Sequence, residues 1–243
     1  MEGYGPATYG DRIADVYDAL YEETLDTDRA VEALADLAAG GPVLELAIGT
    51  GRLALPLASR GLEVHGIDVS ERMVAKLREK PGGETIPVTF GDFANVPVEG
   101  AFRLVFVAFN TLFGLLTQDD QLRCFANVAK HLTDDGVFVV EAFVPDVARF
   151  DRGQRVHVNS VEAERVMLDT SRHDPVEQRV DSQHVVITEE GTTLYPVSIR
   201  YAFPSELDLM ARLAGLELRE RWGSWRRDPF TAESGRHVSV YAR

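Results

Sequence analysis

The chain has 243 residues with 25 Lys and Arg against 39 Asp and Glu, which gives a formal net charge of −14. This acidic balance argues against a general nucleic-acid surface, because phosphate binding draws on clustered lysine and arginine. The single Cys124 excludes an internal disulfide, and with neither a secretory signal nor an apolar run of membrane-spanning length we expect a cytoplasmic protein without membrane partners.

Strand and helix patterns alternate over the first 143 residues. The almost uninterrupted apolar run from Phe102 to Phe109 is typical of a strand covered on both faces, at the centre of a parallel sheet. Ser70 and Thr117 each precede a helical apolar period and are expected N-caps. The expected helices span about 28–39, 53–58, 70–77 and 117–132, and the expected strands span 43–47, 62–67, 86–90, 102–109 and 137–143.

The pattern changes after residue 150. Apolar and polar residues alternate roughly between about 154 and 203, which indicates antiparallel hairpins. Ser205 with Asp208 is expected to cap one last helix, followed by strands over 216–222 and 237–241. The sequence therefore predicts an α/β fold with a doubly wound, seven-stranded, mostly parallel sheet and an antiparallel β insert.

A glycine turn separates the first strand of this sheet from the helix that follows it. In the segment Glu45 to Gly51, glycine permits the backbone to approach a ligand closely, where side chains would collide with it. Gly49, Gly51 and Ala54 also satisfy the loose form of a dinucleotide fingerprint. A dinucleotide is therefore one of two cofactor classes that compete as the ligand of this turn. A tight turn without any ligand is the third interpretation of this feature.

Two acidic residues follow the next strands. Asp68 ends the second strand, where nucleotide-binding sheets hold ribose hydroxyls, although it is also placed to act as an N-terminal acid of the next helix. Gly91, Asp92 and Phe93 follow the third strand and put an acid and an aromatic ring where an adenine would lie. Only the turn and the two acids together make a specific motif, because each of them alone is a weak signal.

This combination resembles the class I S-adenosylmethionine-dependent methyltransferases over roughly Tyr9 to Phe143. The resemblance implies that the turn lies under the methionine part of the cofactor, that Asp68 holds the ribose hydroxyls and that Asp92 bonds the adenine amino group. It further implies that Met73 and Phe93 flank the adenine. The cofactor-binding residues that it implies are Tyr17, Glu45, Ala47, Gly49, Gly51, Asp68, Met73, Asp92, Phe93 and Ala108.

The N-terminal pattern from Tyr9 to Tyr21 looks like the opening helix of small-molecule members, including amino-sugar N-methyltransferases of antibiotic pathways, where it folds over the cofactor. The hairpin region covers the substrate pocket in the same family. We therefore expect a cofactor-binding core with an N-terminal lid helix over 1–150, a substrate lid over 151–203, and a last helix and two strands over 204–243.

Methyl transfer from a sulfonium is an in-line displacement, so alignment and water exclusion matter more than a strong base. Glu141, at the end of the fifth strand, is the candidate catalytic residue, although a carboxylate there also suits a helix cap or a partner for arginine. Tyr21, Asn110 and Phe113 are candidate substrate-binding residues. Several amino-sugar members carry a histidine where this chain has Gly114, which weakens a histidine-based N-methylation mechanism.

We therefore expect a methyltransferase that acts on oxygen or nitrogen of a small molecule and yields S-adenosylhomocysteine, with no metal and as a monomer or homodimer. One alternative is a nicotinamide-dependent oxidoreductase, but the chain lacks a Tyr-x-x-x-Lys pair for hydride transfer. The other is a cofactor-binding protein of the same fold that has lost turnover.

Overall fold

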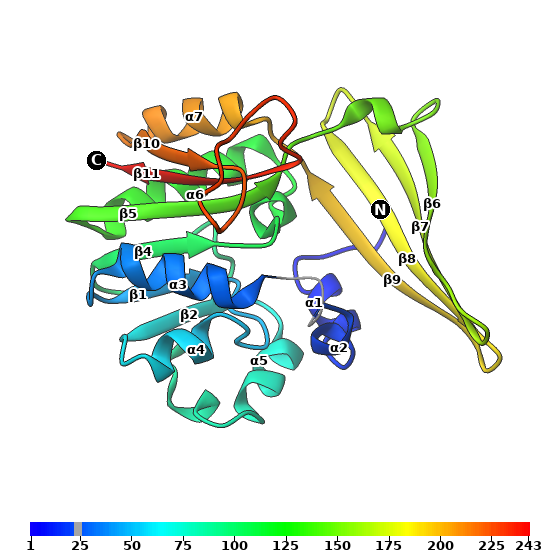
Figure 1. Ribbon diagram of the computed structural model, residues 1–243, viewed down its shortest axis with the longest axis horizontal. Helices are drawn as coiled ribbons and strands as arrows, with labels where there is room; N and C mark the ends of the chain where they lie inside the picture. The colour runs from blue at the N-terminus through cyan, green and yellow to red at the C-terminus, as the bar shows by residue number, and fades with distance from the viewer. Residues whose placement is uncertain (22–25) are drawn as a thin grey trace.

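The computed structural model describes residues 1–21 and 26–243, and it contains two β-sheets (Figure 1). The strands of the larger sheet are β1 (Val43–Leu46), β2 (Val64–Asp68), β3 (Val88–Phe90), β4 (Phe102–Val107), β5 (Leu132–Phe143), β10 (Glu217–Trp222) and β11 (Arg236–Ala242). Their order is β10-β11-β5-β4-β1-β2-β3, in which β1 to β5 pair in parallel and β11 pairs antiparallel with both β5 and β10. The predicted seven-stranded sheet with β4 at its centre is confirmed.

Helices cover both faces of this sheet, which makes it doubly wound. One apolar core joins Phe125 and Leu207 of the helices α6 and α7 to Phe138, and the second joins Leu34 and Leu57 of α3 and α4 to the opposite face. The bounds are α3 (Thr27–Ala38), α4 (Ala54–Ser59), α5 (Glu71–Arg78), α6 (Gln118–His131) and α7 (Pro204–Leu213), with 3₁₀ turns η1 (Gly83–Thr85), η2 (Thr111–Gly114) and η3 (Val147–Arg149).

The smaller sheet is antiparallel and stands beside the carboxyl ends of the parallel strands (Figure 1). Its strands, in spatial order, are β6 (Gln154–Val161), β7 (Arg165–Asp174), β8 (Arg179–Thr188) and β9 (Gly191–Arg200). Two short helices, α1 (Thr8–Ile13) and α2 (Tyr17–Tyr21), lie between it and the larger sheet, and α1 contacts both β9 and α5. We therefore name β6 to β9 the antiparallel wall.

Local structure corrects three details of the sequence analysis. Ser205 does not cap α7, because Pro204 occupies the first turn, where its fixed φ and missing N–H fit, and the N-cap position falls on Phe203. The expected opening helix over Tyr9 to Tyr21 is two helices rather than one. The hairpin region contains the strand β7, which alternation does not identify by itself, because its apolar residues gather at one end and polar residues fill the rest.

The two predicted N-caps are confirmed. The Ser70 hydroxyl accepts a hydrogen bond from the Met73 backbone N–H at 3.2 Å, and Thr117 accepts one from Asp120 at 3.1 Å. These caps fix where α5 and α6 begin. Because α5 follows β2 directly, the first cap also positions the residues at the carboxyl end of that strand.

Candidate active site

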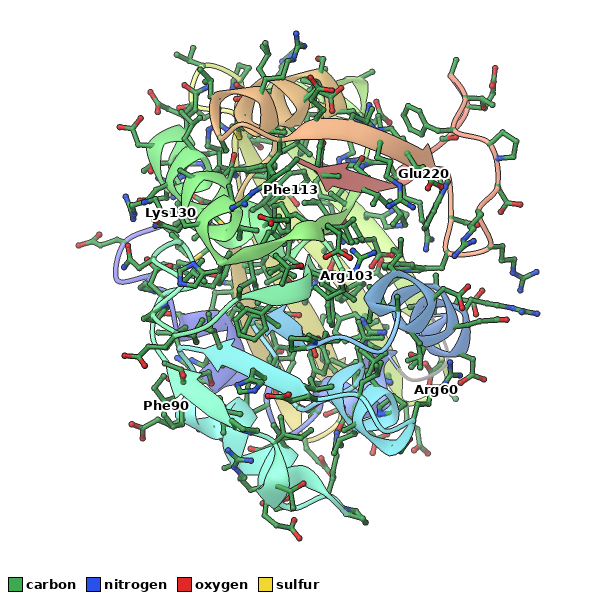
Figure 2. All side chains as sticks on the ribbon, turned by 90° about the vertical axis from the view of Figure 1, so that its left-hand side faces the viewer. Arg60, Phe90, Arg103, Phe113, Lys130 and Glu220 are labelled. Carbon is green, nitrogen blue, oxygen red and sulfur yellow. The ribbon has the colours of Figure 1, made fainter. Side chains whose placement is uncertain are left out.

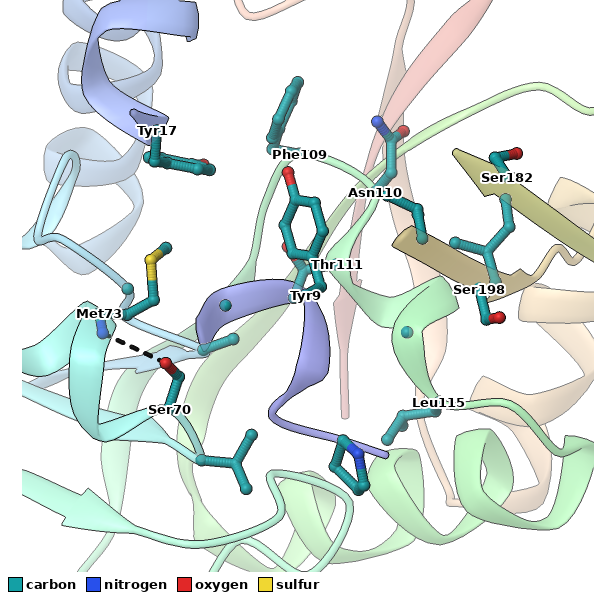
Figure 3. Close-up of a pocket in the computed structure, with 18 of the residues that line it drawn as sticks. Tyr9, Tyr17, Ser70, Met73, Phe109, Asn110, Thr111, Leu115, Ser182 and Ser198 are labelled. Atoms are coloured by element: carbon teal, nitrogen blue, oxygen red, sulfur yellow. Dashed lines mark hydrogen bonds between the residues drawn. The ribbon is translucent and has the colours of Figure 1, made fainter. Parts of the chain in front are cut away.

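A cavity of about 660 Å³ lies between the carboxyl ends of the parallel strands, the two N-terminal helices and the antiparallel wall (Figure 3). Ligands of open α/β sheets collect at this edge. The residues from the sequence analysis that line it are Tyr17, Tyr21, Glu45, Ala47, Gly49, Asp68, Met73, Asp92, Phe93, Ala108 and Asn110. Three others, Gly51, Phe113 and Glu141, lie outside its lining.

The turn after β1 uses its two glycines differently. The Gly49 N–H donates to the Asp68 carboxylate at 2.7 Å, and a Cβ on Gly49 would lie 3.2 Å from the Met73 side chain. A Cβ on Gly51 would lie 2.3 Å from the Leu77 side chain, at a φ of +79°. The glycine turn and Asp68 form one side of the cavity, which we call its floor. Gly49 keeps this floor open, whereas Gly51 lets α5 pack close to the turn.

Asp68 ties this turn to the start of α5. It is 6% exposed, and its second carboxylate oxygen accepts a hydrogen bond from the Ser70 N–H at 2.8 Å. Burial raises the pKa of Asp68, while the backbone hydrogen bonds from Ser70 and Gly49 lower it. The carboxylate thus both anchors the backbone and lines the cavity.

Glu45 is a buried acid with an unpartnered oxygen. It is 6% exposed, and its Oε2 atom has no hydrogen-bond partner within the described part of the chain. Burial raises the pKa of Glu45 to about 8, and the nearby charge of Arg52 opposes that rise. Sequence reasoning missed Arg52, whose guanidinium lies 5.9 Å from the Phe109 ring centroid. An unpartnered buried carboxylate oxygen suits a cationic ligand group.

The loop after β4 is held in an unusual conformation. Phe109 and Asn110 have φ values of +53° and +64°, which L-residues rarely adopt in succession. The Glu141 carboxylate accepts a hydrogen bond from the Phe109 N–H at 2.8 Å, and the Asn110 side chain accepts one from the Phe143 N–H at 2.6 Å. Glu141 therefore supports this loop from β5, and the loop puts Asn110 in the cavity wall.

Phe113 belongs to the apolar core. It is fully buried, its ring centroid lies 5.0 Å from that of Phe143, and Figure 2 shows it inside the molecule. The 3₁₀ turn η2 directs this ring under the loop rather than into the cavity. Its neighbour Phe143 does line the cavity.

Tyr9 of α1 and Tyr17 and Tyr21 of α2 line the cavity, and Figure 3 labels the first two. The hydroxyls of Tyr9 and Tyr21 lie 3.2 Å apart, and the Tyr21 ring contacts Phe109 with centroids 4.9 Å apart. Burial raises the pKa of Tyr17 to about 12 and also raises those of Tyr9 and Tyr21. All three phenols therefore stay protonated near neutral pH and keep an O–H group that can donate a hydrogen bond.

Polar contacts fix these helices to the glycine turn and to the start of α5. Asp18 accepts a hydrogen bond from the Thr50 hydroxyl at 2.6 Å and pairs with Lys80, also at 2.6 Å. The Ser70 hydroxyl donates to Asp11 at 2.6 Å. Residues of the glycine turn and of the α5 cap thus hold α2 and α1 in place.

Strands β6, β7 and β8 of the antiparallel wall present alternate residues to the cavity, whereas β9 contributes the three successive residues 197–199. His157, Asp169 and His184 lie opposite one another on β6, β7 and β8, and all three line it. The imidazole of His184 is hydrogen-bonded to Asp169. Burial acts to raise the pKa of Asp169, but hydrogen bonds from His184 and Asn159, together with the charges of the two histidines, lower it overall. Sequence reasoning could not find this row, because strand register brings together residues far apart in the chain.

The described residues contain no group of histidine, cysteine, aspartate and glutamate arranged to hold a metal ion. No helix among them has the length and apolar character needed to span a membrane.

Known proteins share this fold and this sequence pattern. Residues 43–136 match the family described as a methyltransferase domain. The solved CcbJ methyltransferase from Streptomyces caelestis is 44% identical, covers 98% of this chain and 99% of its own, and superposes with a TM-score of 0.91. The cypemycin N-terminal methyltransferase of a Streptomyces species is 28% identical over 207 residues, which is 84% of each chain.

A more distant structure shows the same fold. CalS10 from Micromonospora echinaspora, described as an amino pentose methyltransferase of calicheamicin biosynthesis and solved with S-adenosylmethionine bound, is 23% identical and has a TM-score of 0.70, covering 94% of this chain and 96% of its own. Together with the near full-length 44% identity to CcbJ, these matches show that the chain belongs to the S-adenosylmethionine-dependent methyltransferases.

Proposed function

We propose that this methyltransferase acts on a nitrogen or oxygen atom of a small molecule held in the 660 Å³ cavity. One observation carries the proposal. The same cavity is bounded on one side by the glycine turn with Asp68 and Glu45, and on the other by the polar face of the antiparallel wall. It therefore has room and chemistry for a methyl donor and an acceptor together.

The cofactor side of the cavity fits S-adenosylmethionine. The unpartnered Glu45 oxygen suits the ammonium of the methionine part, and Asp68 suits the ribose hydroxyls. Met73 and Phe93 supply apolar surface for the adenine, and Asp92 supplies an acceptor for its amino group. We assign backbone contacts to Ala47, Gly49 and Ala108, and give Gly51 the role of allowing α5 to approach.

S-adenosylmethionine, when bound, supplies a methyl group on a positively charged sulfur, which an acceptor lone pair displaces in line. The protein aligns the acceptor and excludes water from it. In our proposal the protonated hydroxyls of Tyr9 and Tyr21 and the amide of Asn110 orient the acceptor. Glu141 is a positioning residue, because it holds the Phe109 loop rather than lining the cavity.

We assign the substrate lid to the antiparallel wall, whose strands run from 154 to 200 within the segment 151–203. The cofactor-binding core is then 1–150, and 204–243 completes the larger sheet with α7, β10 and β11. The acceptor lies between core and lid in this arrangement.

Calorimetric titration with S-adenosylmethionine, S-adenosylhomocysteine, NAD and NADP tests the cofactor side of the proposal. We expect micromolar binding of the two sulfur compounds and none of the nicotinamides. Methyl transfer from labelled S-adenosylmethionine to a panel of small amines and alcohols then tests the acceptor class. Transfer only to a protein or a nucleic acid would contradict the proposed acceptor, and nicotinamide binding would contradict the cofactor assignment.

A further inference from the structure

Two arginines face the cavity from the lid side. Arg149 ends η3 at the rim of the cavity, and Arg155 lies on β6, half-buried. Partial burial and then the charge of Arg155 lower the pKa of Arg149, so the two guanidiniums are close enough to repel each other. Asp146 and Asp169 oppose this effect on Arg149, but no described carboxylate forms an ion pair with either guanidinium.

Arg149 lies next to the acceptor end of the cavity. Its guanidinium carbon is 5.7 Å from the ring centroid of Phe143 and 5.0 Å from that of Phe150. Phe143 in turn donates its backbone N–H to Asn110. Cation–π attraction to these two rings restrains the guanidinium and leaves its N–H donors available.

Two serines extend this surface. Strand register puts Ser171 directly opposite Arg155 on one side and opposite Ser182 on the other, and all three line the cavity. The two hydroxyls lie 2.9 Å apart and share one hydrogen bond. Because each hydroxyl carries one proton and this bond uses only one of them, one O–H remains to donate to another group. Figure 3 shows Ser182 on its strand, on the same side of the pocket as Asn110.

We infer that Arg149, Arg155 and the Ser171–Ser182 hydroxyl pair form a subsite for an anionic group, a carboxylate or a phosphate, on the methyl acceptor. All three elements are donors, and a guanidinium edge matches the two oxygens of such a group. The net charge of −14 repels anions from the surface in general. A pair of cavity arginines without ion pairs attracts an anion locally in spite of that charge. This inference rests on the proposed function, because it names the acceptor class of that cavity.

Titration with four small probes that share a phenyl ring and differ in charge tests the subsite without knowledge of the acceptor. Benzoate and phenyl phosphate are anionic, benzamide is neutral and benzylamine is cationic. We expect the wild-type protein, both free and saturated with S-adenosylhomocysteine, to bind an anionic probe at least about tenfold more tightly than benzamide at low salt. The difference between benzoate and phenyl phosphate tells carboxylate from phosphate.

Variants assign the binding to these side chains. The double variant Arg149→Gln/Arg155→Gln should lose at least about tenfold in affinity for the anionic probe, and Ser182→Ala about two- to threefold. Arg212→Gln is the matched control, because Arg212 is exposed on α7 and does not line the cavity. It should leave the anion affinity unchanged, and far-UV circular dichroism checks that every variant is folded.

Three results would overturn the inference. These are equal affinity of the wild-type protein for benzoate and benzamide, an anion preference that survives in the double variant, and no measurable binding of either anionic probe. S-adenosylhomocysteine calorimetry on the same samples separates the two proposals. If that compound binds and the anions do not, only the subsite fails; if it does not bind, the proposed function fails, while the titration of the free protein still judges the subsite.

Discussion

Asp68 on the cavity floor is 6% exposed and accepts two backbone hydrogen bonds, whereas Arg149 and His157 on the lid side are exposed, and neither forms an ion pair with a described carboxylate. The floor is built from buried residues that also hold the turn and the start of α5. The lid presents side chains whose changes leave the backbone bonding of the larger sheet intact. Under the proposed function, a fixed floor binds the methyl donor that the family shares, while a surface that is free to vary selects the acceptor.

The largest effect should come from the floor. If Asp68 binds the ribose as proposed, Asp68→Ala removes a charge-assisted pair of hydrogen bonds, so we expect it to weaken S-adenosylhomocysteine binding by about 1.5 to 3 kcal/mol, or about 10- to 150-fold. Calorimetry measures the change. Asp134→Ala, at an exposed acid near the start of β5, is the control and should have no effect. Unchanged affinity in Asp68→Ala would break the assignment of the ribose to this residue.

Glu45 should make cofactor affinity depend on pH. Burial raises its pKa to about 8 in the free protein, and a bound ammonium requires the ionised form. The dissociation constant of S-adenosylhomocysteine should therefore rise by up to about tenfold per pH unit as the pH falls below about 8. Glu45→Gln should flatten this dependence. A dependence that persists in the variant would assign it to another group.

The same group should also affect stability. Because the folded-state pKa is raised above the ordinary value of 4.5, the contribution of Glu45 is fully present below that value and is lost as the pH rises through about 8. Urea unfolding of the wild-type protein and Glu45→Gln between pH 5 and 8 should show the wild-type free energy of unfolding decreasing relative to the variant. A constant difference between the two proteins would contradict the raised pKa.

The smallest effect should come from the contact that joins the floor to the N-terminal helices. Asp18→Asn weakens the pairing with Thr50 and Lys80, which is partly exposed, so we expect a loss of only about 0.5 kcal/mol in S-adenosylhomocysteine affinity. Calorimetry at low and high salt measures it, and the difference should shrink at high salt. A loss of affinity as large as that of Asp68→Ala would show that α2 contributes as much to S-adenosylhomocysteine binding as the floor does.

The sequence predicted the floor better than the lid, for physical reasons. Gly49 and Asp68 lie in short segments in which strand, turn and helix follow one another, so local patterns identify them. Arg52 was missed because its charge interaction with Glu45 and its position over the Phe109 ring arise from the packing of separate elements. The position of Glu141 at the end of β5 was predicted, but the direction of its side chain depends on the conformation of the Phe109 loop.

The lid illustrates the same limit more strongly. Alternation indicated hairpins over 154–203 but not the register between them, and a shift of one residue would reverse which side chains face the cavity. Ser171 meets Arg155 and Ser182 only because of that register. Sequence patterns thus indicate that such a wall is present, whereas only the structure shows which of its side chains face the cavity together.

The central claim is that one cavity holds the donor on the floor and leaves the lid side for the acceptor. A crystal structure of the protein with S-adenosylhomocysteine bound tests it most directly. We predict the ribose at Asp68, the adenine between Met73 and Phe93, and free space beside Asn110 and Arg155. A ligand that lies against the antiparallel wall, or that fills the space beside Asn110, would contradict the account.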